Sequence, residues 1–265
     1  MSDEVIVTRP LRMEAAGGTH VGLQREHNED SFAVDVDLGL FLVADGIGGA
    51  ASGEIASQMA VDIVHAGFQD EHDVEITQPL QVESAGPTQQ RLLFWLWKAN
   101  EEIFDVGSRE LRHRGMATTF VGVHANPAAG VMHIAHVGDS RVYRYREERL
   151  EQLTEDHSLL NEFLRRGESL PEPIDPVLAK SVVTRALGME RTIEVEVQVE
   201  DIKPGDLLLL CSDGLSGPVP EEEIIEVLDD TPDLEAAVAA LIDRANEHGG
   251  PDNVTCVLVR WSAPG

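Results

Sequence analysis

The stretch LFLVADGIGG, residues 40–49, guides the interpretation of the whole chain. Its first five residues are a continuous apolar run, with the length and composition of a buried β-strand. The run ends at Asp45 and Gly46, and an acid at the end of a strand projects at the sheet edge, where a site can be open to water. The adjacent glycine lets the backbone approach closely and can offer its carbonyl as a ligand. The stretch therefore predicts a buried strand that ends in a carboxylate at a sheet edge.

Similar acids recur along the chain. They are Asp139 in HVGDSR (136–141), Asp213 after LLLLCS (207–212), Asp252 in GGPDNVT (249–255), and Glu29 with Asp30 in REHNED (25–30). A single Asp-Gly pair is more often ordinary turn chemistry than a ligand. Several carboxylates brought together repel one another, however, and oxygen ligands favour magnesium, manganese or calcium over zinc. Two such ions about 3.5–4 Å apart, bridged by a carboxylate and a water, hydrolyse phosphoesters.

The periodicity around these motifs predicts consecutive strands, with helices grouped in pairs between them. Strands are expected at residues 19–22, 31–36, 40–44, 118–124, 131–137, 141–146, 193–199, 207–211 and 254–259. Helices are expected at residues 51–67, 88–112, 158–166, 221–228 and 234–248, and a surface loop at 69–87. This grouping favours an α+β fold, with antiparallel sheets and helices packed outside them, over a regular βαβ alternation.

The chain is strongly acidic. Its 265 residues carry 48 Asp and Glu against 20 Lys and Arg, a formal charge of −28. Such a field repels nucleic acid and anionic membranes. It would also repel a phosphorylated substrate unless bound divalent metals inverted the local potential. A role of the charge in solubility alone is the alternative.

The sequence also favours a cytoplasmic protein. Its start is acidic and lacks the basic and then apolar pattern of a signal peptide. No apolar run approaches the roughly 18 residues that a membrane span needs. The two cysteines, Cys211 and Cys256, lie inside apolar runs, and we expect them to be buried and reduced.

Seven ordered motifs together resemble the PPM (PP2C-type) family of metal-dependent protein serine/threonine phosphatases, in its bacterial branch. They are RxxNED (25–30), ADGIGG (44–49), VGDSR (137–141), LTxDHS (153–158), VTRALG (183–188), SDGL (212–215) and GPDNVT (250–255). The resemblance covers roughly residues 19–260. It implies a four-layer α-β-β-α sandwich of two antiparallel sheets flanked by helix pairs. We expect one phosphatase domain over residues 18–262, after a lead-in of residues 1–17 with a short strand at 5–7.

The resemblance also implies roles for the acids. Asp45 matches the carboxylate that bridges two core Mn²⁺ or Mg²⁺ ions, and the Gly46 carbonyl matches a ligand to one of them. Asp213 and Asp252 match ligands of the other ion. Asp139, with Asp213, matches a third and weaker metal site.

Further positions follow from the same resemblance. Glu29 and Asp30 match acids that bind or orient metal-bound water, and Arg25 matches the arginine that holds the substrate phosphate, a role suited to its bidentate fork. Residues 159–181 match a flap beside the active site. One position departs from the family, because animal members have a histidine after the Asp-Gly, proposed as general acid, where this chain has Ile47.

The expected function is hydrolysis of phosphoserine and phosphothreonine on proteins, in opposition to a Ser/Thr protein kinase. We expect a monomer, without nucleic-acid or membrane partners. An inactive, phosphoprotein-binding relative is the alternative from another class, but such proteins usually lose a metal-binding aspartate, and this chain keeps every expected acid.

Two further alternatives come from the residues themselves. The segment 40–51, a strand followed by GxGxxA and a helix, also fits a dinucleotide-binding turn, although Asp45 would then face the pyrophosphate. His133 and His136 are three apart on an expected strand, so they should face opposite sides and make a poor zinc pair.

Overall fold

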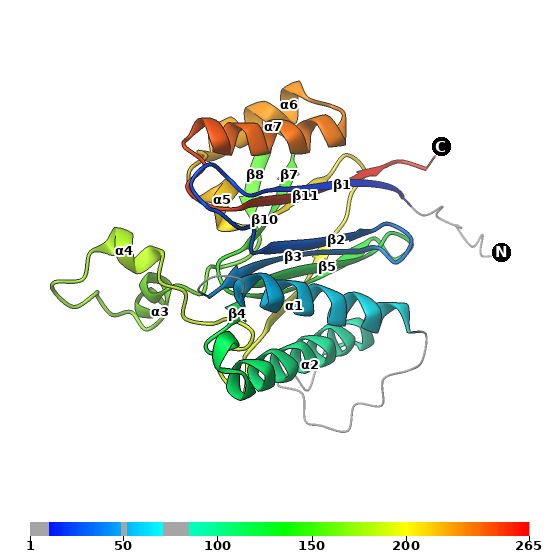
Figure 1. Cartoon of the computed structure of the whole chain (residues 1–265). Helices are drawn as coiled ribbons and strands as arrows, with labels where there is room; N and C mark the ends of the chain where they lie inside the picture. Colours follow the sequence, from blue (N-terminus) through cyan, green and yellow to red (C-terminus); the bar gives the residue numbers. More distant parts are fainter. Residues whose placement is uncertain (1–10, 49–51, 71–84, 265) are drawn as a thin grey trace.

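Two antiparallel sheets stacked face to face form the centre of the molecule, and a pair of helices covers the outer face of each (Figure 1). The structure is a computed structural model, and it describes residues 11–48, 52–70 and 85–264. Helices α1 (Ser52–Gln69) and α2 (Pro87–Arg109) cover one sheet, and α6 (Glu221–Asp230) and α7 (Leu234–Glu247) cover the other. The predicted α+β, four-layer sandwich is confirmed.

Each sheet follows a simple strand order. The first is β1-β11-β10-β7-β8, with β1 (Arg12–His20), β11 (Val254–Ser262), β10 (Leu207–Cys211), β7 (Arg141–Arg146) and β8 (Arg149–Gln152). The second is β2-β3-β5-β6-β9, with β2 (Asp30–Asp35), β3 (Leu40–Ile47), β5 (Phe120–Asn126), β6 (Val131–Val137) and β9 (Glu196–Asp201). The short strand β4 (Ala117–Thr118) pairs with the end of β3.

The continuous apolar runs reflect strands that are buried on both faces. In β3, Leu40 and Leu42 pack against the layer of α1 and α2, whereas Phe41 and Val43 point between the sheets. The same alternation holds in β10, where Leu208 and Leu210 join the inter-sheet core and their neighbours face α6 and α7. Successive side chains of a strand point to opposite faces, so a strand between two hydrophobic layers needs apolar residues at every position.

The first strand begins earlier than predicted. Strand β1 starts at Arg12 and pairs with β11 along its whole length, so residues 12–17, which we expected in a lead-in, belong to the sheet. The sequence signal was weak because β1 is an edge strand whose side chains are mostly exposed or half-buried. The expected strand at residues 5–7 lies outside the described residues, as does most of the expected loop at 69–87.

Other differences also concern elements at the margins of the sandwich. Strand β8 was missed because it is short, polar and at a sheet edge, and β9 begins at Glu196 rather than at residue 193. The one-turn helices α4 (Pro176–Lys180) and α5 (Asp213–Ser216) are too short to show a period. Among the described residues no helix is long and apolar enough to cross a membrane.

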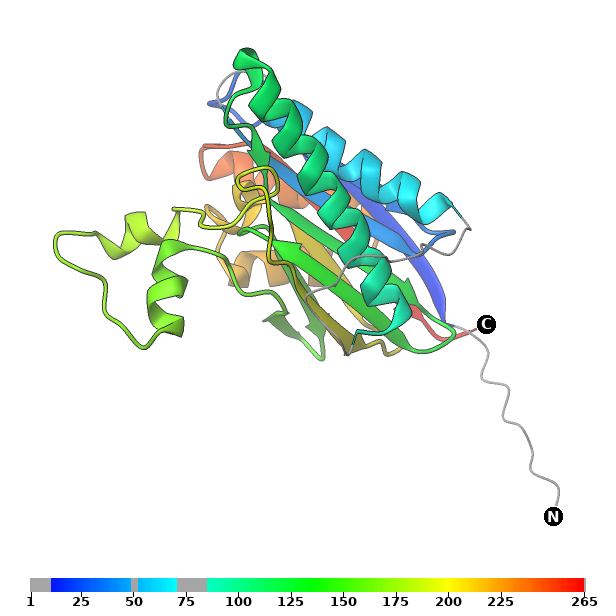
Figure 2. The same ribbon diagram turned by 90° about the horizontal axis from the view of Figure 1, so that it is seen from below.

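The flap, residues 159–181, stands out from the sandwich (Figures 1 and 2). It contains α3 (Leu159–Arg165) and α4, and Ser158 caps α3 by accepting a hydrogen bond from the Asn161 N–H. The two ends of the flap meet at the base, where the Leu159 N–H donates to the Val182 carbonyl. The chain thus leaves the sandwich and returns to it at neighbouring points.

Candidate active site

Five aspartates from distant parts of the chain gather at one end of the two sheets. Asp30 begins β2 and lies opposite Asp45 of β3 in the register of that pair. Asp139 lies in the turn between β6 and β7, where the chain passes from one sheet to the other. Asp213 begins α5 directly after β10, and Asp252 precedes β11. These five residues are called the acidic site below.

The charges of the acidic site act on one another. Burial raises the pKa of Asp30 to about 7, and the carboxylates of Asp213 and Asp252 add to the rise. Burial likewise raises the pKa of Asp139 to about 7, with a contribution from Asp213. The pKa of Asp45 is raised well above its usual value by burial and then by Asp30, Asp213 and Asp139. The structure thus brings these aspartates together, in a setting that disfavours negative charge.

Among the residues that the structure describes, two buried oxygens of the acidic site find no hydrogen-bond partner. Asp30 accepts a hydrogen bond from the Ser212 hydroxyl at Oδ2 (2.8 Å), but its buried Oδ1 has no partner. The buried Oδ1 of Asp213 also has none. A buried carboxylate oxygen is normally paired, and a hard divalent cation is the partner that suits a group of oxygen donors. The residues present therefore fit Mn²⁺ or Mg²⁺.

The backbone of Asp45 is held firmly by the neighbouring strand. Its carbonyl accepts hydrogen bonds from the Thr118 hydroxyl and from the Thr119 N–H, both at 2.8 Å. Its N–H donates to the Thr119 hydroxyl at 3.2 Å. These two threonines were not predicted as part of the site, because neither belongs to a motif with an acid.

Gly46 permits a close contact between β3 and the start of α1. A side chain there would place its Cβ 2.3 Å from the Gly53 carbonyl and 2.6 Å from the Glu29 carbonyl. The Gly46 N–H donates to that Glu29 carbonyl at 3.1 Å. The Oε2 of Glu29 lies beside Gly53, so Glu29 borders the acidic site from the α1 side. The steric need for glycine is thus observed, whereas the metal roles of Gly46 and Glu29 remain predictions.

Arg25 lies at the exposed mouth of the acidic site. Its Nη2 donates to the Asp252 Oδ2 at 2.5 Å. The guanidinium is exposed and Asp252 is half-buried, so the pair sits at the boundary with solvent. The structure therefore brings Arg25 next to the acids, as predicted.

Asn253, inside the GPDNVT motif, is a further residue of the site for which the sequence predicted no role. Its Oδ1 accepts from the Glu29 N–H at 2.7 Å, and its Nδ2 donates to the carbonyls of Val21 and His27, both at 2.9 Å. One buried side chain thus fixes the loop that carries Arg25 and Glu29 against the segment that carries Asp252.

The dinucleotide alternative is wrong. Strand β3 pairs antiparallel with both β2 and β5, so the segment is not part of a parallel βαβ unit. The prediction that His133 and His136 make a poor zinc pair agrees with the structure, because His133 faces His124 and His136 stacks on His157. Ile47 pairs with Ala117, so no titratable side chain occupies the position of the animal general acid.

Comparison with known proteins agrees with this geometry. The family model described as protein phosphatase 2C matches residues 17–261. A serine/threonine phosphatase, Stp, of Listeria monocytogenes is 38% identical over 254 residues, which are 93% of this chain and 95% of that protein. The solved structure of the Mycobacterium tuberculosis serine/threonine phosphatase PstP/Ppp is 31% identical with a TM-score of 0.79, over 94% of this chain and 99% of that one.

A second solved structure concerns the metal. The catalytic domain of PstP in complex with two manganese ions is 30% identical with a TM-score of 0.77, over 95% of this chain and 99% of that one. The match of the family model, the relatives and the clustered aspartates lead to one conclusion: the chain belongs to the protein phosphatase 2C family of protein serine/threonine phosphatases, in its bacterial branch.

Proposed function

We propose that this phosphatase hydrolyses phosphoserine and phosphothreonine esters on proteins with a water activated between two divalent ions, Mn²⁺ or Mg²⁺, in the acidic site. The observation that carries the proposal is the burial of several aspartates with raised pKa values and unpartnered oxygens at one point. When bound, the ions supply Lewis acidity and lower the pKa of the attacking water.

The aspartates take different places in this scheme. Asp45 is central, since the charges of Asp30, Asp139 and Asp213 all act on it, and it would be shared by both ions. The Gly46 carbonyl would help to hold one ion, and Asp213 with Asp252 would hold the other. Asp139, beside Asp213, would hold a third and weaker ion.

Arg25 binds the phosphate of the substrate. Its guanidinium is exposed at the mouth of the site, and its planar fork matches two oxygens of a phosphate group. In a chain with a charge of −28, this cation and the bound ions give the local attraction that an anionic substrate needs. Glu29 and Asp30 follow Arg25 closely in the chain, and we assign them the role of orienting water beside the metal ions.

The biological setting follows from the chemistry. Phosphate on serine or threonine is placed there by a Ser/Thr protein kinase, so we propose that this enzyme opposes one. The relatives named above are serine/threonine phosphatases, which supports phosphoprotein substrates. We also propose that the protein is a monomer and that it lies in the cytoplasm, where a reducing environment suits its two free, buried cysteines.

The experiment that tests this function measures hydrolysis of a small aryl phosphate and of a phosphothreonine peptide, first in EDTA and then with added Mn²⁺. Turnover that needs the metal and resists okadaic-acid-type inhibitors is the expected result. Bound Mn²⁺ without turnover would favour a phosphoprotein-binding module instead.

A further inference from the structure

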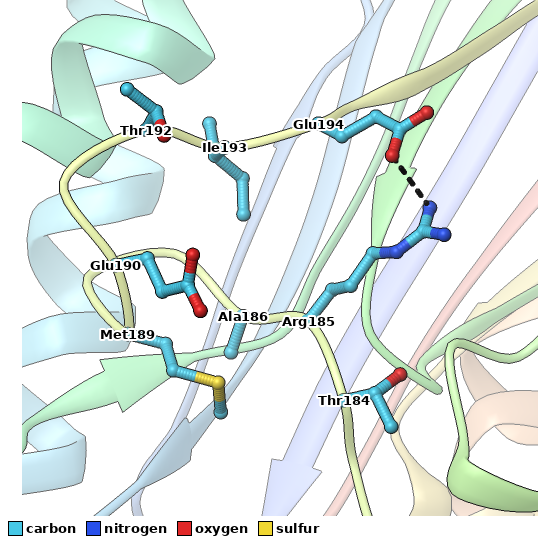
Figure 3. Close-up of a pocket in the computed structure, with 8 residues that line it drawn as sticks. All are labelled: Thr184, Arg185, Ala186, Met189, Glu190, Thr192, Ile193 and Glu194. Carbon is cyan, nitrogen blue, oxygen red and sulfur yellow. Dashed lines mark ion pairs between the residues drawn. The ribbon is translucent and has the colours of Figure 1, made fainter. Parts of the chain in front are cut away.

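A second cluster of titratable side chains lies beside the acidic site and has no part in the chemistry proposed above. It joins His136 on β6, His157 before the flap, Arg165 on α3, Arg185 after the flap, and Glu196 on β9. We call it the Glu196 cluster. Figure 3 shows Arg185 in the wall of a neighbouring pocket of about 330 Å³, where its side chain points toward Glu194 (3.6 Å).

The cluster is not built as a metal site, although His136, His157 and Glu196 bring three ligand atoms within 4.8 Å of one another. The Nδ1 of His157 accepts a hydrogen bond from the Gly138 N–H, so the ring proton lies on Nε2. The Nε2 of His136 bonds the Glu155 carbonyl, which can only accept, so this nitrogen also carries a proton. A protonated ring nitrogen has no lone pair for a metal.

The cluster holds the turn that carries Asp139. His157 contacts Gly138 twice. Its ring Nδ1 accepts a hydrogen bond from the Gly138 N–H at 3.0 Å, and its backbone N–H donates to the Gly138 carbonyl at 2.9 Å. Gly138 has a φ of +104°, and a side chain there would place its Cβ 2.6 Å from the Cβ of Thr119. The position of Asp139, the next residue, therefore depends on His157.

The cluster also holds the flap. The Arg165 Nη2 lies 2.7 Å from the Glu196 Oε1, and its Nε donates to Glu155 at 3.0 Å. Arg185 binds Glu162 of the same helix α3 at 2.9 Å and lies 3.5 Å from the Glu196 Oε1. Two arginines thus link α3 to Glu196.

We propose that Glu196 is a positioning residue that couples the flap to the Asp139 end of the acidic site. One carboxylate oxygen, Oε1, lies 2.7 Å from the Arg165 Nη2 and 3.1 Å from the His157 Nε2. A displacement of α3 that moves Arg165 away changes the charge facing His157. Because the His157 ring bonds Gly138, the turn before Asp139 is then held differently. This proposal rests on the proposed function in one respect, because it takes Mn²⁺ as the ligand that the acidic site binds.

The test uses Glu196→Gln, which keeps the size of the side chain and removes its charge. The Glu196 side chain is 35% exposed, so the substitution avoids the folding risk of a change at the fully buried His157. Glu200→Gln is the matched control. Glu200 lies on the same face of β9, is 28% exposed and binds Arg144 at 3.0 Å, away from the flap.

Two measurements separate coupling from a loss of stability. Calorimetric titration measures Mn²⁺ binding directly, and timed trypsin digestion measures cleavage after Arg165 and Arg166 in the flap. We expect Glu196→Gln to weaken Mn²⁺ binding by about tenfold, the effect typical of removing a supporting partner of a ligand. We also expect faster flap cleavage, whereas Glu200→Gln should change neither.

A second substitution identifies the carboxylate through which Glu196 acts. In an Asp139→Asn background, Glu196→Gln should no longer weaken Mn²⁺ binding. Equal Mn²⁺ affinity in Glu196→Gln and Glu200→Gln would overturn the proposal, and so would an effect that persists without Asp139. A wild-type protein that bound no Mn²⁺ would instead overturn the proposed function. In that case the coupling would stand only if Asp139→Asn changed the rate of flap cleavage in otherwise wild-type protein but did not change it in the Glu196→Gln protein.

Discussion

The acidic site and the Glu196 cluster are neighbours whose carboxylates have opposite electrostatic environments. In the acidic site the pKa values of Asp30, Asp45 and Asp139 are raised by burial and by other acids. At Glu196 burial also raises the pKa, but Arg165 and His157 outweigh it and the net pKa is lowered. Carboxylates that the protein leaves uncompensated indicate a ligand from outside, whereas a compensated one stabilises the structure.

The largest expected effect comes from Asp45→Asn. This change removes the central carboxylate of the acidic site, and we expect turnover with Mn²⁺ to fall on the order of a thousandfold in an aryl-phosphate assay. In EDTA the same variant should melt at a higher temperature than the wild type, because one repelling charge is gone. Glu196→Gln, which removes a compensated charge, should melt lower. If Asp45→Asn turned over substrate as fast as the wild type, Asp45 would not be a residue of the active site.

Gly46→Ala should be strongly destabilising. The new Cβ would lie 2.3 Å from the Gly53 carbonyl, so α1 has to move, and we expect a loss of about 3 kcal/mol in urea unfolding. Gly167→Ala in the flap is the matched control. Gly167 has a φ of +68° but nothing within 4 Å of the new Cβ, so about 1 kcal/mol of backbone strain is expected. Equal losses would mean that the contact between β3 and α1 adapts freely.

Arg25→Ala should act mainly on substrate affinity. The guanidinium lies at the mouth of the site, so its removal should raise KM for a phosphopeptide about tenfold with little change in kcat. Arg25→Lys keeps the charge but lacks the planar fork, so its KM should lie between those of the wild type and Arg25→Ala. A change confined to kcat would contradict a role in phosphate binding.

The smallest expected effect is the pH dependence of the metal-stripped protein. The folded pKa of Asp30 is about 7 and its usual value is 3.8, so its contribution to stability is fully present below about pH 4 and is lost as the pH rises toward 7. In EDTA, the Tm of Asp30→Asn relative to that of the wild type should therefore rise by several degrees as the pH increases over this range. Scanning fluorimetry measures this difference. A constant difference in Tm would mean that Asp30 titrates normally.

The sequence indicated most of the acidic site but not the Glu196 cluster, because the motifs that contain His157 and Arg185 did not show that these residues meet. Asp45 and Asp213 were recognisable because each follows a long apolar run and precedes a glycine. Such a position is defined locally, by the end of a strand. The strands themselves were predictable because burial on both faces demands uninterrupted apolar residues.

The rest depends on tertiary contacts. His136 and Glu196 meet through the register of β6 with β9, and His157 reaches Gly138 across 19 residues of chain. No local pattern encodes either contact. Strand β1 escaped prediction for a related reason, because an edge strand needs little apolar character and gains its order from β11.

The place of β11 in its sheet has a consequence for the timing of activity. This strand, residues 254–262, is inserted between the first strand, β1, and β10. The segment just before it supplies Asp252 and also Asn253, which fixes the loop bearing Arg25. During synthesis, every other acid of the site leaves the ribosome before this one. A nascent chain therefore lacks Asp252 in the acidic site until residues 252–262 have been made and β11 has joined β1 and β10.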